Sequence, residues 1–159
     1  MTPGHDATVS ASAQFERGTD GPRVILAGVD GSPTSLRAVS YAAGLARRQR
    51  SRLVVVFVVA PTPAMVGWVP NGEQVAGEAA AEVADEIRRE VELGATTLGI
   101  EIDYRTVHGD PVAELTRTAD EVLADAVVVG ASEQAGHRVI GSVAVRLVKA
   151  GHWPVTVVP

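Results

Sequence analysis

The stretch VILAGVDGSP occupies residues 24–33 of a chain of 159 residues. Its first six residues are apolar without alternation, which is typical of a parallel strand covered on both faces. Ser32 can then cap a helix, and Pro33 suits the first helical turn because no backbone hydrogen bond is lost there. The stretch therefore predicts a buried strand that leads directly into a helix.

The same succession of strand and helix continues to the end of the chain. Strands are predicted at 24–29, 53–59, 100–105, 126–129 and 155–158. The strand at 100–105 alternates apolar and charged residues, so we place it at a sheet edge in contact with water. Strands and helices joined by right-handed crossovers predict one doubly wound α/β domain, with a five-stranded parallel sheet and four helices. Ligands of such sheets bind beyond the carboxyl ends of the strands.

The segment 60–72 holds three prolines and two glycines, so it predicts a long loop. Trp68 lies in this loop together with Met65 and Val66, and we weigh two interpretations of its indole: closing over a ligand, or packing on the helix that comes next. We expect that helix to be the longest of the four. Its predicted buried stripe has an apolar residue at every fourth position: Val75, Ala79, Val83, Ile87 and Val91.

The last two helices are predicted from their starts. Asp110 and Pro111 supply a cap and a first turn, and Ser142 is expected to cap the final helix, which stops before Gly151.

Composition excludes several classes of function. The chain has 14 basic and 19 acidic residues and a formal charge of −5, so no positive field attracts nucleic acid or an anionic membrane. The absence of cysteine excludes disulfides and cysteine-ligated metals.

Residues 1–22 are small and polar and lack the apolar centre of a signal peptide. We interpret them as a mobile tail before a folded domain at 23–159, and we expect a cytoplasmic location.

Five segments together resemble the universal stress protein family. They are 29–32 (VDGS), 109–111 (GDP), 127–130 (VVVG), 141–142 (GS) and 154–158 (PVTVV). The resemblance covers 23–159. It implies strand order 3-2-1-4-5 in a Rossmann-like fold of the adenine nucleotide alpha hydrolase type. It also implies, for nucleotide-binding members, ATP held over the ends of the first and fourth strands.

The resemblance assigns roles to five positions. Asp30 would hydrogen-bond the adenosine part and the backbone of Val58 would meet the adenine edge, while Gly130, Gly141 and Ser142 would face phosphates. The residues alone also permit local roles: Asp30 as a turn residue, and Gly141 with Ser142 as an ordinary helix start. Both interpretations stay open at this stage.

The phosphate loop departs from the nucleotide-binding pattern at two points. Glu133 stands where the pattern has a second glycine, and a carboxylate about 4 Å from a phosphate costs roughly 1 kcal/mol even in water. The residues Gln134 to Ile140 number seven where the pattern has nine. Gly136, His137 and Arg138 can compensate in part, because an arginine presents a planar fork of donors. The cofactor is therefore ATP, another adenine nucleotide, or none.

The sequence predicts no catalytic residue and no metal ligand. His5, His108, His137 and His152 stand far apart and form no zinc motif. The spacing of Gly136 and Gly141 suits a P-loop, but Ser142 occupies the lysine position, so a P-loop ATPase is not expected. We expect a non-catalytic regulator. Two alternatives stay open: a partner-binding module with no ligand in the crevice at the strand ends, and an enzyme that slowly hydrolyses ATP.

The strand at 155–158 ends the chain and lies at a sheet edge in the implied order. Such an edge invites pairing with another strand. We therefore expect a homodimer through Val155, Val157 and Val158, as the family resemblance also implies, and no nucleic-acid or membrane partner.

Overall fold

The computed structural model describes residues 21–61, 63, 67–134 and 137–159, and the side chains of 133–139 are outside the described part. Four sets of expectations therefore concern residues that are not described. They are the tail over 1–20 with His5, the contacts of Met65 and Val66, the backbone of Gly136, and the side chains of Glu133, His137 and Arg138.

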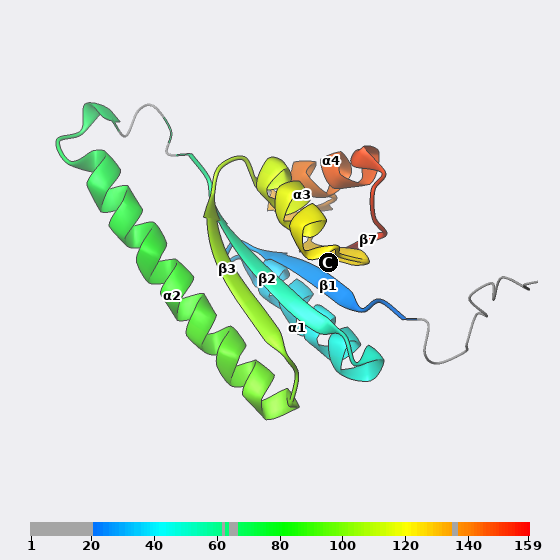
Figure 1. Cartoon of the computed structure of the whole chain (residues 1–159). Coiled ribbons are helices and arrows are strands. Elements are labelled where there is room, and N and C mark those ends of the chain that lie inside the picture. The colour runs from blue at the N-terminus through cyan, green and yellow to red at the C-terminus, as the bar shows by residue number, and fades with distance from the viewer. Residues whose placement is uncertain (1–20, 62, 64–66, 135–136) are drawn as a thin grey trace, which may run out of the picture.

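The central feature is a parallel sheet. Within the described residues it has five strands in the order β3-β2-β1-β4-β7, which confirms the predicted order 3-2-1-4-5 (Figure 1). All neighbouring strands pair in parallel. The bounds are β1 Val24–Val29, β2 Arg52–Val59, β3 Ile102–His108, β4 Ala126–Gly130 and β7 Val155–Val158.

Helices cover the sheet on both faces (Figure 1). Alternate residues of β1 point to opposite faces: Ile25 and Ala27 pack with α1 and α2, and Leu26 packs with α3 and α4. Both faces of β1 are thus buried, which explains its continuous apolar run. The bounds are α1 Pro33–Gln49, α2 Gly72–Leu98, α3 Pro111–Val122 and α4 Ser142–Ala150. Within the described part of the chain, no helix is long and apolar enough to cross a membrane.

Two of the three predicted helix caps are present. The Ser32 hydroxyl accepts from the backbone N–H of Ser35 at 3.2 Å, and the Asp110 carboxylate accepts from that of Ala113 at 3.0 Å. The prediction that Ser142 caps α4 is wrong. Gly141 takes the cap position in an extended conformation, so Ser142 is the first helical residue, and no side-chain hydrogen bond caps this end.

Helix α2 departs from the predicted stripe. Ile87 and Val91 are buried as expected, but Val75 is 61% exposed and Val83 is 42% exposed. The reason is geometric. Four residues exceed one helical turn by about 40°, so a strict four-residue repeat drifts around the helix and leaves the buried face. The buried residues of the later half instead have a mixed spacing: Ala84, Ile87, Val91 and Ala95.

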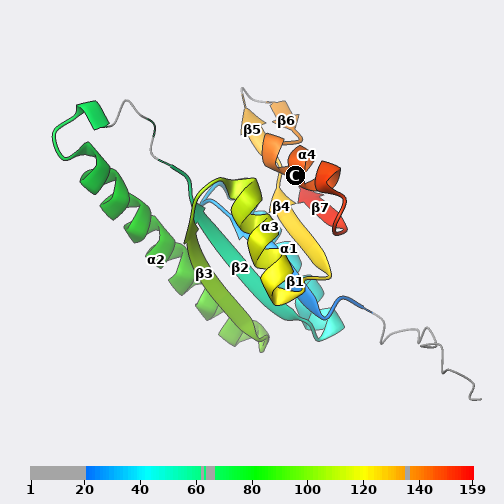
Figure 2. The ribbon, with the colours of Figure 1, turned by 45° about the horizontal axis from the view of Figure 1, so that its top comes forward.

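A short antiparallel hairpin interrupts the segment between β4 and α4. Its strands are β5, Ser132–Gln134, and β6, His137–Val139, and Figure 2 shows them beside α4. The sequence predicted only a loop here, because strands of three residues without apolar alternation carry no recognisable pattern.

Strand β3 of the main sheet begins and ends later than predicted, at Ile102 and His108 instead of 100 and 105.

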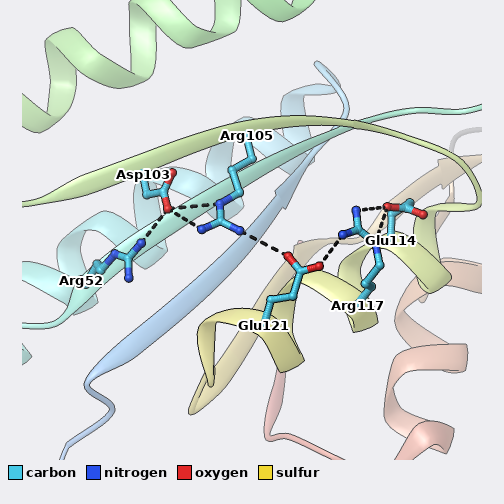
Figure 3. Close-up of polar contacts among 6 residues, drawn as sticks. All are labelled: Arg52, Asp103, Arg105, Glu114, Arg117 and Glu121. Carbon is cyan, nitrogen blue, oxygen red and sulfur yellow. Dashed lines mark hydrogen bonds and ion pairs between the residues drawn. The ribbon is translucent and has the colours of Figure 1, made fainter.

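An ion-pair ladder runs from the edge of the sheet onto α3 (Figure 3). Asp103 on β3 accepts from Arg52 at 2.6 Å and from Arg105 at 2.9 Å. Arg105 continues to Glu121 at 3.6 Å. We use the name ion-pair ladder for the whole set: Arg52, Asp103, Arg105, Glu121, Arg117 and Glu114. It pairs Asp103 and Arg105, two of the charged residues that alternate with apolar ones in this part of the sequence.

The ladder predicts a loss of stability in acid. The hydrogen bond from Arg105 is the main cause that holds the pKa of Asp103 below its usual value of 3.8, with partial burial opposing it and Arg52 assisting. Because the folded-state pKa is depressed, the stabilisation is complete above 3.8 and is lost as pH falls through the folded-state pKa. Urea unfolding of the wild type and Asp103→Asn from pH 6 down to pH 2 should show a shallower acid decline in the variant. Parallel curves would contradict this role of Asp103.

Thr118 on α3 offers a second stability prediction. It is 1% exposed, and its hydroxyl is the one buried side-chain oxygen without a hydrogen-bond partner among the described residues. An unpaired buried polar group costs about 1–3 kcal/mol, and valine has nearly the same shape. Thr118→Val should therefore raise the free energy of unfolding by about 1 kcal/mol in a urea titration. Thr96→Val serves as the control: Thr96 is exposed and its hydroxyl donates to the carbonyl of Glu92, so this variant should not be more stable.

Candidate functional site

A cavity lies at the carboxyl ends of the central strands. It has a volume of about 490 Å³ and is bounded by the ends of β1 and β4 and by the first turns of α1 and α4. The strand order changes direction at this point: β2 and β3 lie on one side of β1, whereas β4 and β7 lie on the other. Doubly wound proteins bind ligands at such a switch point. We call this cavity the crevice.

All five predicted site residues line the crevice: Asp30, Val58, Gly130, Gly141 and Ser142. They come from four separate parts of the chain, namely the ends of β1, β2 and β4 and the start of α4. The structure therefore brings together the positions that the family resemblance selected. Their individual roles toward a ligand remain predictions.

Asp30 forms a tight turn at the mouth of the crevice. Its carboxylate accepts from the N–H of Ser32 at 2.9 Å, and its own N–H donates to the Ser35 hydroxyl at 3.2 Å. Gly31 between them has φ +86°, a conformation that favours glycine. Burial works to raise the pKa of Asp30, but the hydrogen bonds from Ser32 and Ser35 outweigh it and lower the pKa. The carboxylate is thus a fixed, ionised acceptor.

Gly130 is required by packing. A Cβ built on it would lie 2.6 Å from the backbone N of Ser35 and 2.6 Å from the carbonyl carbon of Thr34. The end of β4 is thus pressed directly against the first turn of α1. Gly141 is tight as well, because its Cβ would lie 3.0 Å from that of Ser132. The two glycines bring backbone, instead of side chains, to the walls of the crevice.

The start of α4 supplies donors. Ser142 is exposed and directly follows the extended Gly141, and the N–H groups of this first turn have no capping side chain. Uncapped N–H groups and the positive end of the helix dipole attract anions. This end of the crevice can therefore accept a phosphate or carboxylate.

Sequence reasoning missed several residues of the crevice. Thr34 and Ser35 in the first turn of α1 are 2% and 4% exposed, and Ser132 lies two positions after β4. The signal for Thr34 and Ser35 was a pair of hydroxyl residues just after the cap Ser32 and Pro33, at the predicted ligand-binding end. Trp68 does not line the crevice, and it is 90% exposed, so its indole does not pack on α2 as one interpretation expected.

The charge of the crevice is limited. Among the described residues that line it, Asp30 carries the one formal charge, and no lysine or arginine is present. Over the described part of the chain, no three His, Asp or Glu side chains lie close enough together to hold a metal ion. Besides the Asp30 carboxylate, the described lining offers hydrogen bonds from backbone and hydroxyl groups.

These features define a doubly wound α/β protein with a crevice at its switch point. Residues 22–159 match the model of the universal stress protein family, and the chain belongs to that family.

Relatives agree with the family over most of the chain. A universal stress protein of Methanocaldococcus jannaschii is 31% identical over 132 residues, which are 81% of this chain and 77% of that protein. The structure of a family protein from Burkholderia pseudomallei matches with a TM-score of 0.69 and 28% identity, covering 86% of this chain and 96% of that one. A universal stress protein solved in complex with cAMP matches with a TM-score of 0.62 and 29% identity, covering 87% and 97%.

Proposed function

We propose that this protein is a stress-response regulator whose crevice binds an adenine nucleotide without catalysing a reaction on it. One observation carries the proposal: the carboxylate of Asp30 and the uncapped start of α4 face the same cavity of about 490 Å³. This volume lies in the range of small-molecule sites, about 300–1,000 Å³. The 29% identical relative in complex with cAMP supports the ligand class.

The two ends of the crevice suit the two ends of a nucleotide. Asp30 is an ionised acceptor, and such a group pairs with ribose hydroxyl donors. The N–H groups at Ser142 are donors, and they pair with phosphate oxygens. Val58 adds an apolar wall for the base. The residues present therefore fit a nucleotide whose adenosine lies toward β1 and whose phosphate lies toward α4.

A binding role without catalysis is favoured by the residues that line the crevice. Its described hydroxyl groups, such as those of Ser32 and Ser142, have no histidine or lysine beside them in the lining to take a proton. Asp30 is engaged by the N–H of Ser32. The proposal keeps the cytoplasmic location expected from the sequence.

Isothermal titration calorimetry with AMP, cyclic AMP and Mg-ATP tests the proposed function. At least one of them should bind with a stoichiometry of one per chain, and no phosphate should be released from ATP under the same conditions. The absence of heat with all three would favour the second candidate, a partner-binding regulator with an empty crevice. That candidate draws its support from Glu133 at the glycine position and from the shortened loop after it.

We also propose that the chain forms a homodimer through the free edge of β7. The carbonyls of Pro154 and Val158 accept from the β4 side, so the backbone of Val157 points to the free edge. β7 is half-buried and apolar at Val155, Val157 and Val158. Light scattering at micromolar concentration should give twice the chain mass. Val157→Pro removes an outward N–H while keeping the pairing with β4, so it should give the single mass; a monomeric wild type would contradict the proposal.

A further inference from the structure

At the start of α4, the described lining of the crevice offers N–H donors for a phosphate but no basic side chain. Its described lining holds no lysine or arginine, so the charges of several phosphates would meet no basic side chain there. Each additional phosphate charge adds to the mutual repulsion of the phosphates. Within the described part of the chain, we therefore look for a compensating cation at the rim of the crevice.

Arg146 and Asp110 form a bidentate ion pair at that rim. The guanidinium donates from Nη1 to Oδ2 at 3.1 Å and from Nη2 to Oδ1 at 3.0 Å. Arg146 lies one helical turn beyond Ser142 on the same side of α4, and Asp110 directly precedes Pro111; Ser142 and Pro111 both line the crevice. The pair thus joins the starts of α3 and α4 next to the phosphate end.

Asp110 serves two functions at once. The same carboxylate that holds Arg146 also caps α3 by accepting from the N–H of Ala113. It therefore stays in place whether or not Arg146 is bound to it, whereas the guanidinium of Arg146 is held by its two hydrogen bonds to Asp110. The mobile member of the pair is the cation.

We propose that the Asp110–Arg146 pair sets the number of phosphates that the crevice accepts. Paired with Asp110, Arg146 is neutralised, and the crevice favours a nucleotide with one phosphate. Released from Asp110, Arg146 turns toward the start of α4 and binds the outer phosphates of a di- or triphosphate. This inference rests on the proposed function, because it concerns the phosphate end of the same crevice.

The exchange is energetically accessible. The side chains of Arg146 and Asp110 are 54% and 45% exposed, and ion pairs that are this exposed contribute little free energy. Breaking the pair to release Arg146 therefore lowers the affinity for a triphosphate by at most about fivefold. A charge-assisted hydrogen bond from Arg146 to a phosphate increases that affinity by about tenfold or more. Asp110 thus competes with the outer phosphates for Arg146, and a polyphosphate displaces Asp110 in part.

Asp110→Asn and Arg146→Gln test the inference in the full chain. Asparagine caps a helix as well as aspartate does, so α3 keeps its start while Arg146 is released. ITC with AMP and with ATP, at one magnesium concentration and low salt, gives the ratio Kd(AMP)/Kd(ATP). We expect this ratio to rise by about threefold or more in Asp110→Asn and to fall by about tenfold in Arg146→Gln. A general loss of structure would change both affinities together and leave the ratio unaltered.

The ion-pair ladder offers matched controls. Arg117 and Glu121 are paired on α3, are 52% and 47% exposed, and do not line the crevice. Glu121→Gln and Arg117→Gln therefore repeat the two changes in charge at a distance from the site, and the ratio should stay at the wild-type value in both. An unchanged ratio in Asp110→Asn and Arg146→Gln, in a protein that binds AMP or ATP, would overturn this inference alone. No binding of AMP, cyclic AMP or ATP by the wild type and by Asp110→Asn would overturn the proposed function with it, whereas binding of cyclic AMP alone would overturn only this inference.

Discussion

Gly130→Ala is expected to lower the free energy of unfolding by about 3 kcal/mol, because an added methyl group has no space at the end of β4. The new Cβ would lie 2.6 Å from backbone atoms of both Thr34 and Ser35. Backbone atoms cannot rotate away as a side chain does, so α1 or β4 must shift. For a chain of this size, the thermal midpoint should fall by about 10 °C in a calorimetric scan.

Gly94→Ala provides the control for this substitution. Gly94 lies inside α2, and a Cβ built on it meets nothing within 4 Å. Alanine is a better helix former, so this variant should be more stable by about 0.5–1 kcal/mol. A Gly130→Ala protein that unfolds with the wild-type midpoint would show that the start of α1 yields easily, and the packing role of Gly130 would be wrong.

Ser142→Asp is expected to weaken nucleotide binding strongly without destabilising the fold. A carboxylate in the first turn of α4 interacts favourably with the helix dipole, by about 0.3–1 kcal/mol. The same carboxylate would meet the phosphate at the start of the helix. Two like charges about 4 Å apart repel by roughly 1 kcal/mol in water and about 4 kcal/mol near a protein surface, which lowers affinity by between about fivefold and a thousandfold.

Two variants separate charge from other effects in the calorimetric titration. Ser142→Ala removes only the hydroxyl and should cost far less than Ser142→Asp. Ser40→Asp adds the same charge on α1, where Ser40 is exposed and does not line the crevice. Its affinity for the nucleotide should therefore equal that of the wild type. Equal losses in Ser40→Asp and Ser142→Asp would mean that total charge, and not the start of α4, governs binding.

Local patterns predicted the fold well. The apolar run at 24–29 and the cap at Ser32 depend on neighbouring residues alone, and both are present. The five candidate residues also meet at one crevice, because parallel strands end at the same side of a sheet. Features that depend on short-range chemistry and topology are therefore visible in the sequence.

Features that depend on distant contacts were not predictable in the same way. The packing role of Gly130 arises from α1, nearly a hundred positions earlier, and Arg146 meets Asp110 across 36 positions. No local pattern encodes these pairings, because they are created only when the helices dock.

The two free edges of the sheet differ in a way that limits growth. If β3 of one copy could add to β7 of the next, each addition would leave a new open edge, and the sheet would lengthen into a fibre. The charged side chains of Asp103 and Arg105 on β3 make that addition costly. In the proposed dimer, β7 pairs with β7 of a second copy, and this symmetric contact leaves no open β7 edge to which a third copy could add.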